Sequence, residues 1–181
     1  TSGYSNSAFG IYALYSNTTA INNTAVGREA LYSNTTASNN AALGYQALYA
    51  NTTGYSNVAV GSAALRLVTT GVANVAVGTD ALYTNTGDSN TGVGHYAMRG
   101  NTSGSYNTAL GQQALYNNTT ASGNMAVGYQ AMYSNTTGAY STGVGHQALY
   151  SSNTDYNTGV GYIAGLNTTT GQANAYFGHK F

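Results

Sequence analysis

The sequence predicts an all-β fold, a parallel β-solenoid of ten coils of about 17 residues, in which residues 1–181 form a single repeat domain. Three observations predict it. A glycine-centred phrase recurs every 16 or 17 residues along the whole chain. Each unit has two short apolar pieces, separated by Gly and by Asn-Thr-Thr, which disfavour helix interiors. One unit is too short for two helices, but it holds two short strands, a glycine corner and a polar loop.

The repeat is registered on a glycine, and positions are counted from this glycine as position 0. The unit is Asn-Thr-Ala-Val-Gly-x-x-Ala-Leu-Tyr-Ser-Asn-Thr-Thr-x-x-x, as in residues 23–39. Two intervals have 16 residues, and both are shortened in the polar stretch, where Asp88 and Asp155 stand at equivalent positions. This predicts a loop in which the Asp side chain bonds the nearby backbone. The registering glycines are Gly10, Gly27, Gly44, Gly61, Gly78, Gly94, Gly111, Gly128, Gly145, Gly161 and Gly178.

Two pairs of adjacent positions carry the apolar residues. Position −1 is always large, whereas position −2 is almost always Ala or Gly; position +3 is Ala, and position +4 is Leu or Met in nearly every unit. Because neighbouring residues of a strand face opposite sides, we expect the large residues at −1 to fill the core and the small ones to lie outside. Such a surface suits close contact with another chain, as at a trimer axis, or else the solenoid is narrow and its Ala columns lie near corners. Val77→Asp is then expected to be severely destabilising, and Thr36→Asp, in the loop, to cost little.

Polar and aromatic columns predict ladders along the solenoid axis. Asn stands at position −4 in every unit except that of Ser141, and stacked amides hydrogen-bond along such an axis. Position +5 is Tyr in seven units. Arg66 and Arg99 replace this Tyr twice, and we expect each guanidinium to lie over a neighbouring tyrosine ring. Leu166 is the third replacement.

The composition argues against catalysis and against charged partners. Only 4% of residues are charged, and the four basic and four acidic residues cancel. We therefore expect no binding to nucleic acid, and no apolar run approaches the ~18 residues of a membrane helix. Without Cys, the chain has neither a disulfide nor a thiolate metal site. The first residues carry neither an initiator Met nor a signal pattern, which predicts a processed form or a fragment.

Candidate catalytic and metal-binding residues are far apart in the predicted solenoid. Glu29 and Asp80 lie three coils apart, roughly 14 Å, and Asp88 and Asp155 lie four coils apart, roughly 19 Å. A glycosidase pair needs about 5–9.5 Å. We therefore expect no enzyme activity, cofactor or metal, and interpret the histidines as surface residues. The histidines all stand at position +1, two coils apart at nearest, which is about 10 Å, and are His95, His146 and His179.

The polar loop suggests two further functions. Its Asn-x-Ser/Thr sequons are candidate glycosylation sites, from which a glycan would project, and are otherwise turn residues. A Thr column at position +8, from Thr18 to Thr136, resembles the Thr ranks of ice-binding proteins, which makes ice binding an alternative function. Glycan binding on the Tyr and Asn ladders is another. The candidate glycosylation sites are Asn17, Asn34, Asn51, Asn101, Asn118, Asn135 and Asn167.

The phrase Asn-x-Ala-Val-Gly-x-x-Ala, as in residues 23–30 and 124–131, resembles the repeat of trimeric autotransporter adhesin heads. The longer form that ends in Leu-Tyr-Ser-Asn-Thr-Thr-Gly is similar to repeats of phage tail-fibre-like and bacterial surface proteins. The resemblance implies a left-handed β-roll. It also implies a structural, non-enzymatic segment of an extracellular fibre, surface adhesin or tail fibre, located at a cell or virion surface. The partners implied are further copies of the chain, as a homotrimer or head-to-tail fibril, and surface glycans.

The ends of the chain predict assembly. End coils expose unpaired strand edges, which soluble repeat proteins cover with polar caps. Here only Lys180 resembles an edge guard. Phe9 and Phe177 share position −1, so we expect copies to continue the core head to tail with an aromatic contact at the seam; alternatively, Phe plugs each open end. The expected assembly-end residues are Phe9, Tyr176, Phe177 and Phe181.

Overall fold

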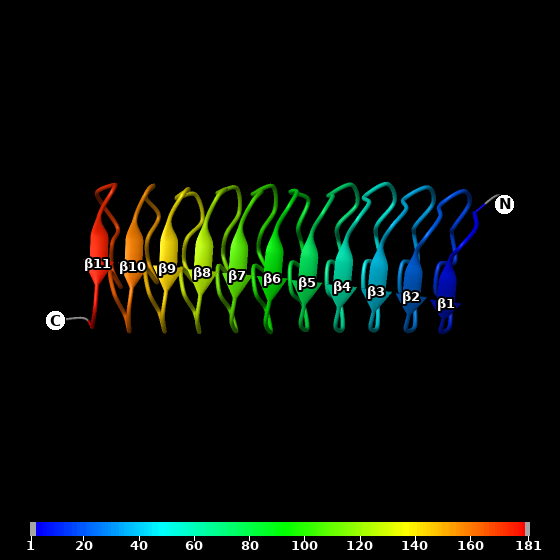
Figure 1. Ribbon diagram of the computed structural model, residues 1–181, viewed down its shortest axis with the longest axis horizontal. Coiled ribbons are helices and arrows are strands. Elements are labelled where there is room, and N and C mark those ends of the chain that lie inside the picture. Colours follow the sequence, from blue (N-terminus) through cyan, green and yellow to red (C-terminus); the bar gives the residue numbers. More distant parts are fainter. Residues whose placement is uncertain (1–2, 180–181) are drawn as a thin grey trace.

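The structure, a computed structural model, describes residues 3–179 and confirms the parallel β-solenoid. The coils stack along one axis, so the first strand, β1, and the last, β11, lie at opposite ends of a rod (Figure 1). Within residues 3–179, nothing forms a helix of the length and hydropathy that crossing a membrane requires. The strands are β1 (Ser7–Phe9), β2 (Thr24–Val26), β3 (Ala41–Leu43), β4 (Val58–Val60), β5 (Val75–Val77), β6 (Thr91–Val93), β7 (Thr108–Leu110), β8 (Met125–Val127), β9 (Thr142–Val144), β10 (Thr158–Val160) and β11 (Ala175–Phe177).

The strands form one parallel sheet in the order of the sequence, and equivalent positions pair across every interface. The two shortened units keep this register, because the missing residue is absorbed outside the strands. There Asp88 Oδ1 accepts the Val72 backbone N–H at 2.9 Å, and Asp155 Oδ1 accepts that of Ala139 at 2.8 Å. The predicted loop is confirmed, but each Asp side chain bonds the backbone of the preceding coil, 16 residues away, and not the backbone beside it in the sequence.

The second strand of each coil, expected at the Ala-Leu piece, does not form. This piece is a run of turns in which the residues on either side of Ala30 are left-handed, with φ of 59° at Glu29 and 51° at Leu31. The turns still stack on the next coil, since the Leu31 N–H donates to the Ala47 carbonyl at 3.0 Å. Because the left-handed residues break the alternation of a strand, Ala30 and Leu31 both point inward and are fully buried.

The two faces of the strands are the reverse of what we expected. Ala25, at position −2, is fully buried, whereas Leu43, at position −1, is 50% exposed. The core consists of the small residues at −2 and +3 and the Leu or Met at +4. These Leu side chains leave no room for larger residues at −2: a Cβ on Gly159 would lie 2.8 Å from Leu149 Cγ. The expectation that Val77 fills the core is therefore wrong, since Val77 is a half-buried residue of the outer face.

The corner glycines permit the close stacking of coils. Gly44 has a φ of 141°, a conformation that L side chains rarely adopt. A Cβ on Gly44 would also lie 2.4 Å from the carbonyl oxygen of Gly61 in the next coil. The column of glycines is therefore both a conformational and a steric requirement of the rod.

Two columns of buried asparagine hold the loop to the coil. At position −4, Asn40 donates its backbone N–H to Asn23 Oδ1 and its Nδ2 to the Gly54 carbonyl, both at 2.9 Å. This confirms an axial Asn ladder, although most of its rungs are bonds between a side chain and the backbone. At position +7, Asn51 Nδ2 donates to Asn34 Oδ1 at 3.0 Å and to the same Gly54 carbonyl at 2.9 Å. The ladder from amide to amide thus lies mainly in a column that sequence analysis assigned to the exposed loop.

Candidate functional site

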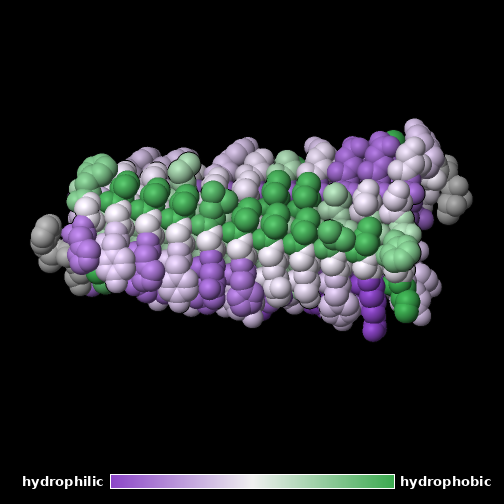
Figure 2. Space-filling model, turned by 60° about the horizontal axis from the view of Figure 1, so that its bottom comes forward, coloured by the Kyte–Doolittle hydropathy of each residue, from purple (hydrophilic) through white to green (hydrophobic). Residues whose placement is uncertain are grey.

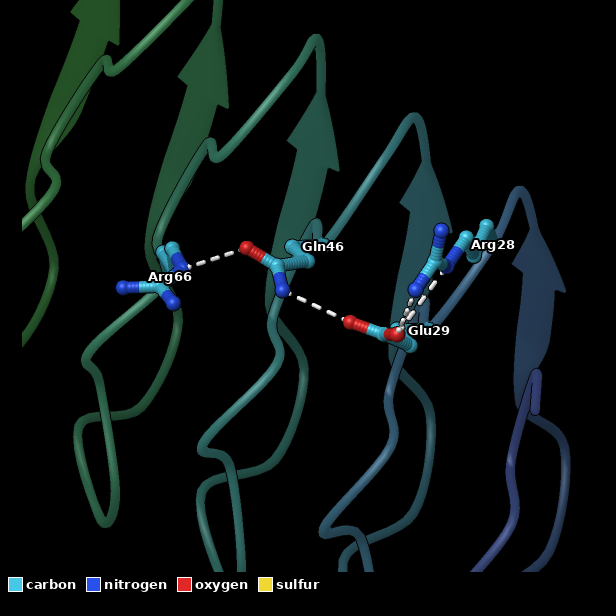
Figure 3. A network of polar contacts seen from close by, with 4 residues as sticks. All are labelled: Arg28, Glu29, Gln46 and Arg66. Atoms are coloured by element: carbon cyan, nitrogen blue, oxygen red, sulfur yellow. Dashed lines mark hydrogen bonds and ion pairs between the residues drawn. The ribbon is translucent and has the colours of Figure 1, made fainter. Parts of the chain in front are cut away.

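Most of the charged residues that the structure describes lie on the turn segments, where they form ion pairs with one another or hydrogen bonds with neighbouring side chains. Gln46 Nε2 donates to Glu29 Oε2 at 2.6 Å, and Gln46 Oε1 accepts from Arg66 Nε at 2.7 Å, so the amide bridges the two charges (Figure 3). Arg28 forms an ion pair with Glu29 at 3.0 Å. The hydrogen bond from Gln46, with that from Arg28, outweighs partial desolvation and lowers the pKa of the Glu29 carboxyl from its ordinary value of 4.5.

The remaining carboxylates also have structural partners. Asp80 forms an ion pair with Arg99 at 3.2 Å, while Asp88 and Asp155 accept backbone N–H groups in the shortened loops. Each of the four carboxylates therefore has its own structural partner, and none of these partners is another carboxylate. Among residues 3–179, no group of three His, Asp or Glu side chains is arranged to hold a metal ion.

A tyrosine ladder runs along the rod at position +5, as predicted. The rings of Tyr15 and Tyr32 stack with centroids 5.2 Å apart, and those of Tyr32 and Tyr49 at 5.1 Å. Burial, followed by the neighbouring tyrosines, raises the pKa of Tyr32 from its ordinary value of 10.0. The ring faces lie against one another, so solvent and any glycan meet mainly their edges and hydroxyl groups.

Arginine fills the gaps in this ladder, which confirms the second part of the prediction. The Arg66 guanidinium lies 5.5 Å from the Tyr49 ring and 5.7 Å from the Tyr83 ring. Arg99 lies 5.0 Å from the other side of Tyr83. These contacts are within the range of cation–π interactions, so the column stays filled across both substitutions.

A shorter aromatic ladder, which sequence analysis missed, lies at position +1. The rings of Tyr129 and His146 are 5.1 Å apart, those of His146 and Tyr162 are 5.1 Å apart, and those of Tyr162 and His179 are 4.9 Å apart. The alternation of Tyr and His at one position in successive coils was the signal for it. The histidines are exposed, as expected, but they stack on tyrosines.

An apolar band covers the outer face of the sheet over the length of the rod (Figure 2). Positions −1 and −3 point outward on either side of the buried residue at −2. The band consists of the large residue at −1 in every strand and of the apolar residues that five strands have at −3, whereas the other six have Ser or Thr there; the five are Ala41, Val58, Val75, Met125 and Ala175. On one side it borders the glycine column, which has no side chains. The residues at position −1, always Val, Leu or Phe, make a continuous ridge beside this groove.

The assembly-end residues have different positions from those expected. Phe9 and Phe177 do share a column, but it is the outer one, and they are 78% and 72% exposed. They neither plug nor extend the core. Tyr176 closes the C-terminal end of the core instead, because it stands at the inward position −2 and packs against the core. It covers Gly165, the one residue at +4 that is not Leu or Met. Phe181 lies outside the described residues.

The C-terminal end of the core is partly open. A hollow of about 540 Å³ lies there, lined by residues 163–170 and 175–179. At the other end, Ala8 occupies the inward position −2 but is exposed, because no coil covers it. Among the described residues, the lining of the hollow has no Lys, Arg, Asp or Glu side chain.

Most of the sequon asparagines are inside the rod, which corrects the expectation that they project from the loop. Five of them occupy position +7 and are fully buried, because their amides bind the neighbouring coil and the loop carbonyl. Asn17 is half-buried, and Asn167 is exposed. The five buried ones are Asn34, Asn51, Asn101, Asn118 and Asn135.

The threonines at position +8 use their hydroxyl groups within the rod. Thr18 Oγ1 donates to the Thr35 carbonyl at 2.9 Å, and Thr102 Oγ1 donates to the Thr119 carbonyl at 2.8 Å. These hydroxyls therefore bind the next coil, and the neighbouring position +9, with Thr19 for example, is exposed.

No protein-family model, no curated protein and no solved structure matches this chain.

Proposed function

We propose that the chain is a structural, non-enzymatic segment of an extracellular fibre, a surface adhesin or tail fibre, that assembles with further copies of itself at a cell or virion surface. One observation carries the proposal. Position −1 faces outward, yet it holds a large apolar residue in every coil, from Phe9 to Phe177. Exposed apolar surface of this extent marks interaction sites.

The periodicity of this surface favours a second copy as its partner. The ridge at position −1 and the adjacent glycine groove both repeat once per coil, at about 4.8 Å. Only a surface with the same spacing meets this one equally at every coil, and another rod of this chain has that spacing. Four residues of width and ten coil rises of length give roughly 630 Å² per copy, or about 1,260 Å² for a pair. This exceeds the ~1,000 Å² expected of a specific interface.

The experiment compares oligomeric state with and without the apolar band. Light scattering coupled to size exclusion should give the mass of a homotrimer or larger assembly for the native chain. Val77→Asp should dissociate it without unfolding the coils, because the new carboxylate stays in water in the monomer and is desolvated only at the interface. Thr36→Asp, on the exposed loop, is the matched control and should assemble normally. A native chain that remains monomeric at high concentration would contradict the lateral interface.

The ends of the rod give a second contact. The edges of β1 and β11 have unpaired backbone groups that another parallel strand can satisfy. Head-to-tail stacking through these edges lengthens the assembly, whereas the band widens it. Electron micrographs separate the two, since loss of lateral contacts in Val77→Asp should leave thinner filaments.

A further inference from the structure

The tyrosine ladder contains two uninterrupted segments, Tyr15–Tyr32–Tyr49 and Tyr116–Tyr133–Tyr150. Neighbouring rings in both have centroids 5.1–5.2 Å apart and planes within 11° of parallel. Tyr140 and Tyr156, at position −5, form a further stacked pair at 5.5 Å. Because equivalent positions of parallel coils carry each pair, the rings project in the same direction and their hydroxyl-bearing edges lie side by side.

We propose that these stacked tyrosines are an oxidative modification site, at which neighbouring rings couple to dityrosine and cross-link successive coils. The oxidant is hydrogen peroxide activated by a haem peroxidase. It removes one electron and the phenolic proton from each of two tyrosines and is reduced to two waters. The two phenoxyl radicals form a carbon–carbon bond between positions ortho to their oxygens. The ortho hydrogens then move to the oxygens, so each link costs the protein two hydrogens.

The ladder directs this coupling to neighbours within one chain. A partner ring already held at about 5 Å reacts as if at very high concentration, whereas a radical on an isolated ring must wait for a collision. Tyr55 and Tyr106 are 54% and 71% exposed but have no stacked tyrosine, so they serve as internal controls. Tyr83 lies between two arginines, which cannot couple.

The tyrosine rings of the ladder are partly exposed to solvent, so oxidants can reach them. Tyr15 is 63% exposed at the end of its segment, and Tyr133 and Tyr150 are half-buried. Each link would close a loop of one coil with a covalent bond. Such closure restricts the unfolded chain, as other covalent cross-links do, and should raise the melting temperature of the rod.

The experiment treats a mixture of ¹⁵N-labelled and unlabelled chains with peroxidase and hydrogen peroxide, then maps cross-linked peptides by mass spectrometry. We expect dityrosine within the two segments and the Tyr140–Tyr156 pair, always joining peptides of the same label. Links that mainly join different labels, or that mainly involve Tyr55 and Tyr106, would overturn the proposal. Since the labels report links within one chain whatever the state of assembly, this result is independent of the fibre proposal.

Two variants test the role of the stacking. Tyr32→Phe combined with Tyr133→Phe keeps the aromatic surface but removes every adjacent tyrosine pair from the two segments. Among the stacked pairs, only the Tyr140–Tyr156 link should remain, with the circular dichroism spectrum unchanged. The edge-on pairs Tyr12–Tyr15 and Tyr96–Tyr116 are the same in the variant and in the native chain, so any links between them should not change. Arg66→Tyr joins Tyr49 to Tyr83 through a continuous ladder and should add links there. An undiminished yield in the double variant would equally refute coupling along the ladder.

Discussion

Val68 interrupts the inner asparagine ladder, and we expect Val68→Asn to stabilise the rod. Val68 is fully buried at position +7, between Asn51 and Asn85 of the adjacent coils. Because it has no donor, Asn51 Oδ1 is buried without a hydrogen-bond partner. The Gly71 carbonyl accepts only one amide, that of Asn57, whereas equivalent carbonyls accept two. The site thus has unused hydrogen-bonding capacity on both sides.

The expected gain is small but measurable. An amide at position 68 would donate to Asn51 Oδ1 and to the Gly71 carbonyl and would accept from Asn85, and three such bonds contribute about 3 kcal/mol. Loss of the buried Val side chain costs about 2 kcal/mol. The difference is about 1 kcal/mol in the free energy of unfolding, which for a chain of this size raises the melting temperature by roughly 2–4 °C.

The assay is thermal and urea unfolding followed by circular dichroism, with Asn101→Val as the reciprocal control. That change removes the amide that donates to Asn85 Oδ1 and to the Gly104 carbonyl and that accepts from Asn118. It should lower stability by about 1 kcal/mol or more. If Val68→Asn lowered the melting temperature while Asn101→Val raised it, apolar burial would outweigh the amide ladder and the reasoning would be refuted.

Three further predictions concern the backbone corner and the titrating groups. Gly44→Ala should destabilise the rod by about 3 kcal/mol or more in urea unfolding, because its backbone is strained for any L side chain and its Cβ meets the next coil. The stability that Glu29 contributes is present above pH 4.5 and is lost as pH falls, since its folded pKa is lowered; Glu29→Gln should flatten the acid side of the stability profile. Tyr32 and Tyr133, with raised pKa values, should ionise last in an ultraviolet titration, and the stability linked to them should fall as pH rises above 10.

The repeat was sufficient to predict the stacking but not the cross-section of a coil. Stacking follows from identical positions one coil apart, so the sheet register and the guanidinium of Arg66 over its neighbouring rings were accessible from spacing alone. Alternation along a strand shows that Ala25 and Val26 face opposite sides, but not which side is inside. That choice depends on Leu31, whose left-handed conformation is unfavourable for L residues and has no propensity signal.

One signal for the cross-section was present in the sequence. Position −2 is restricted to Ala and Gly in all but the last coil, where it is Tyr176. An exposed column has no reason to exclude larger side chains, so this restriction indicates a tightly packed interior. The burial of the asparagines at position +7, such as Asn34, was not predicted, because Asn-Thr-Thr is both a sequon and a typical turn sequence and both suggest an exposed loop.

Comparing the residue types at one position across all coils also shows which positions are restricted and which vary freely. Exposed position +1 varies among Ile, Arg, Tyr, Ser, Thr, His and Gln, as expected of a surface without a partner. Exposed position −1 holds only Val, Leu or Phe. Strand propensity does not explain this, because position −3 faces the same way in the same strands and holds Ser, Thr, Ala, Val and Met. Because the fold of the coil does not impose this restriction on the neighbouring outward column, we attribute it to a contact outside the coil, and we therefore place the proposed lateral contact along that ridge.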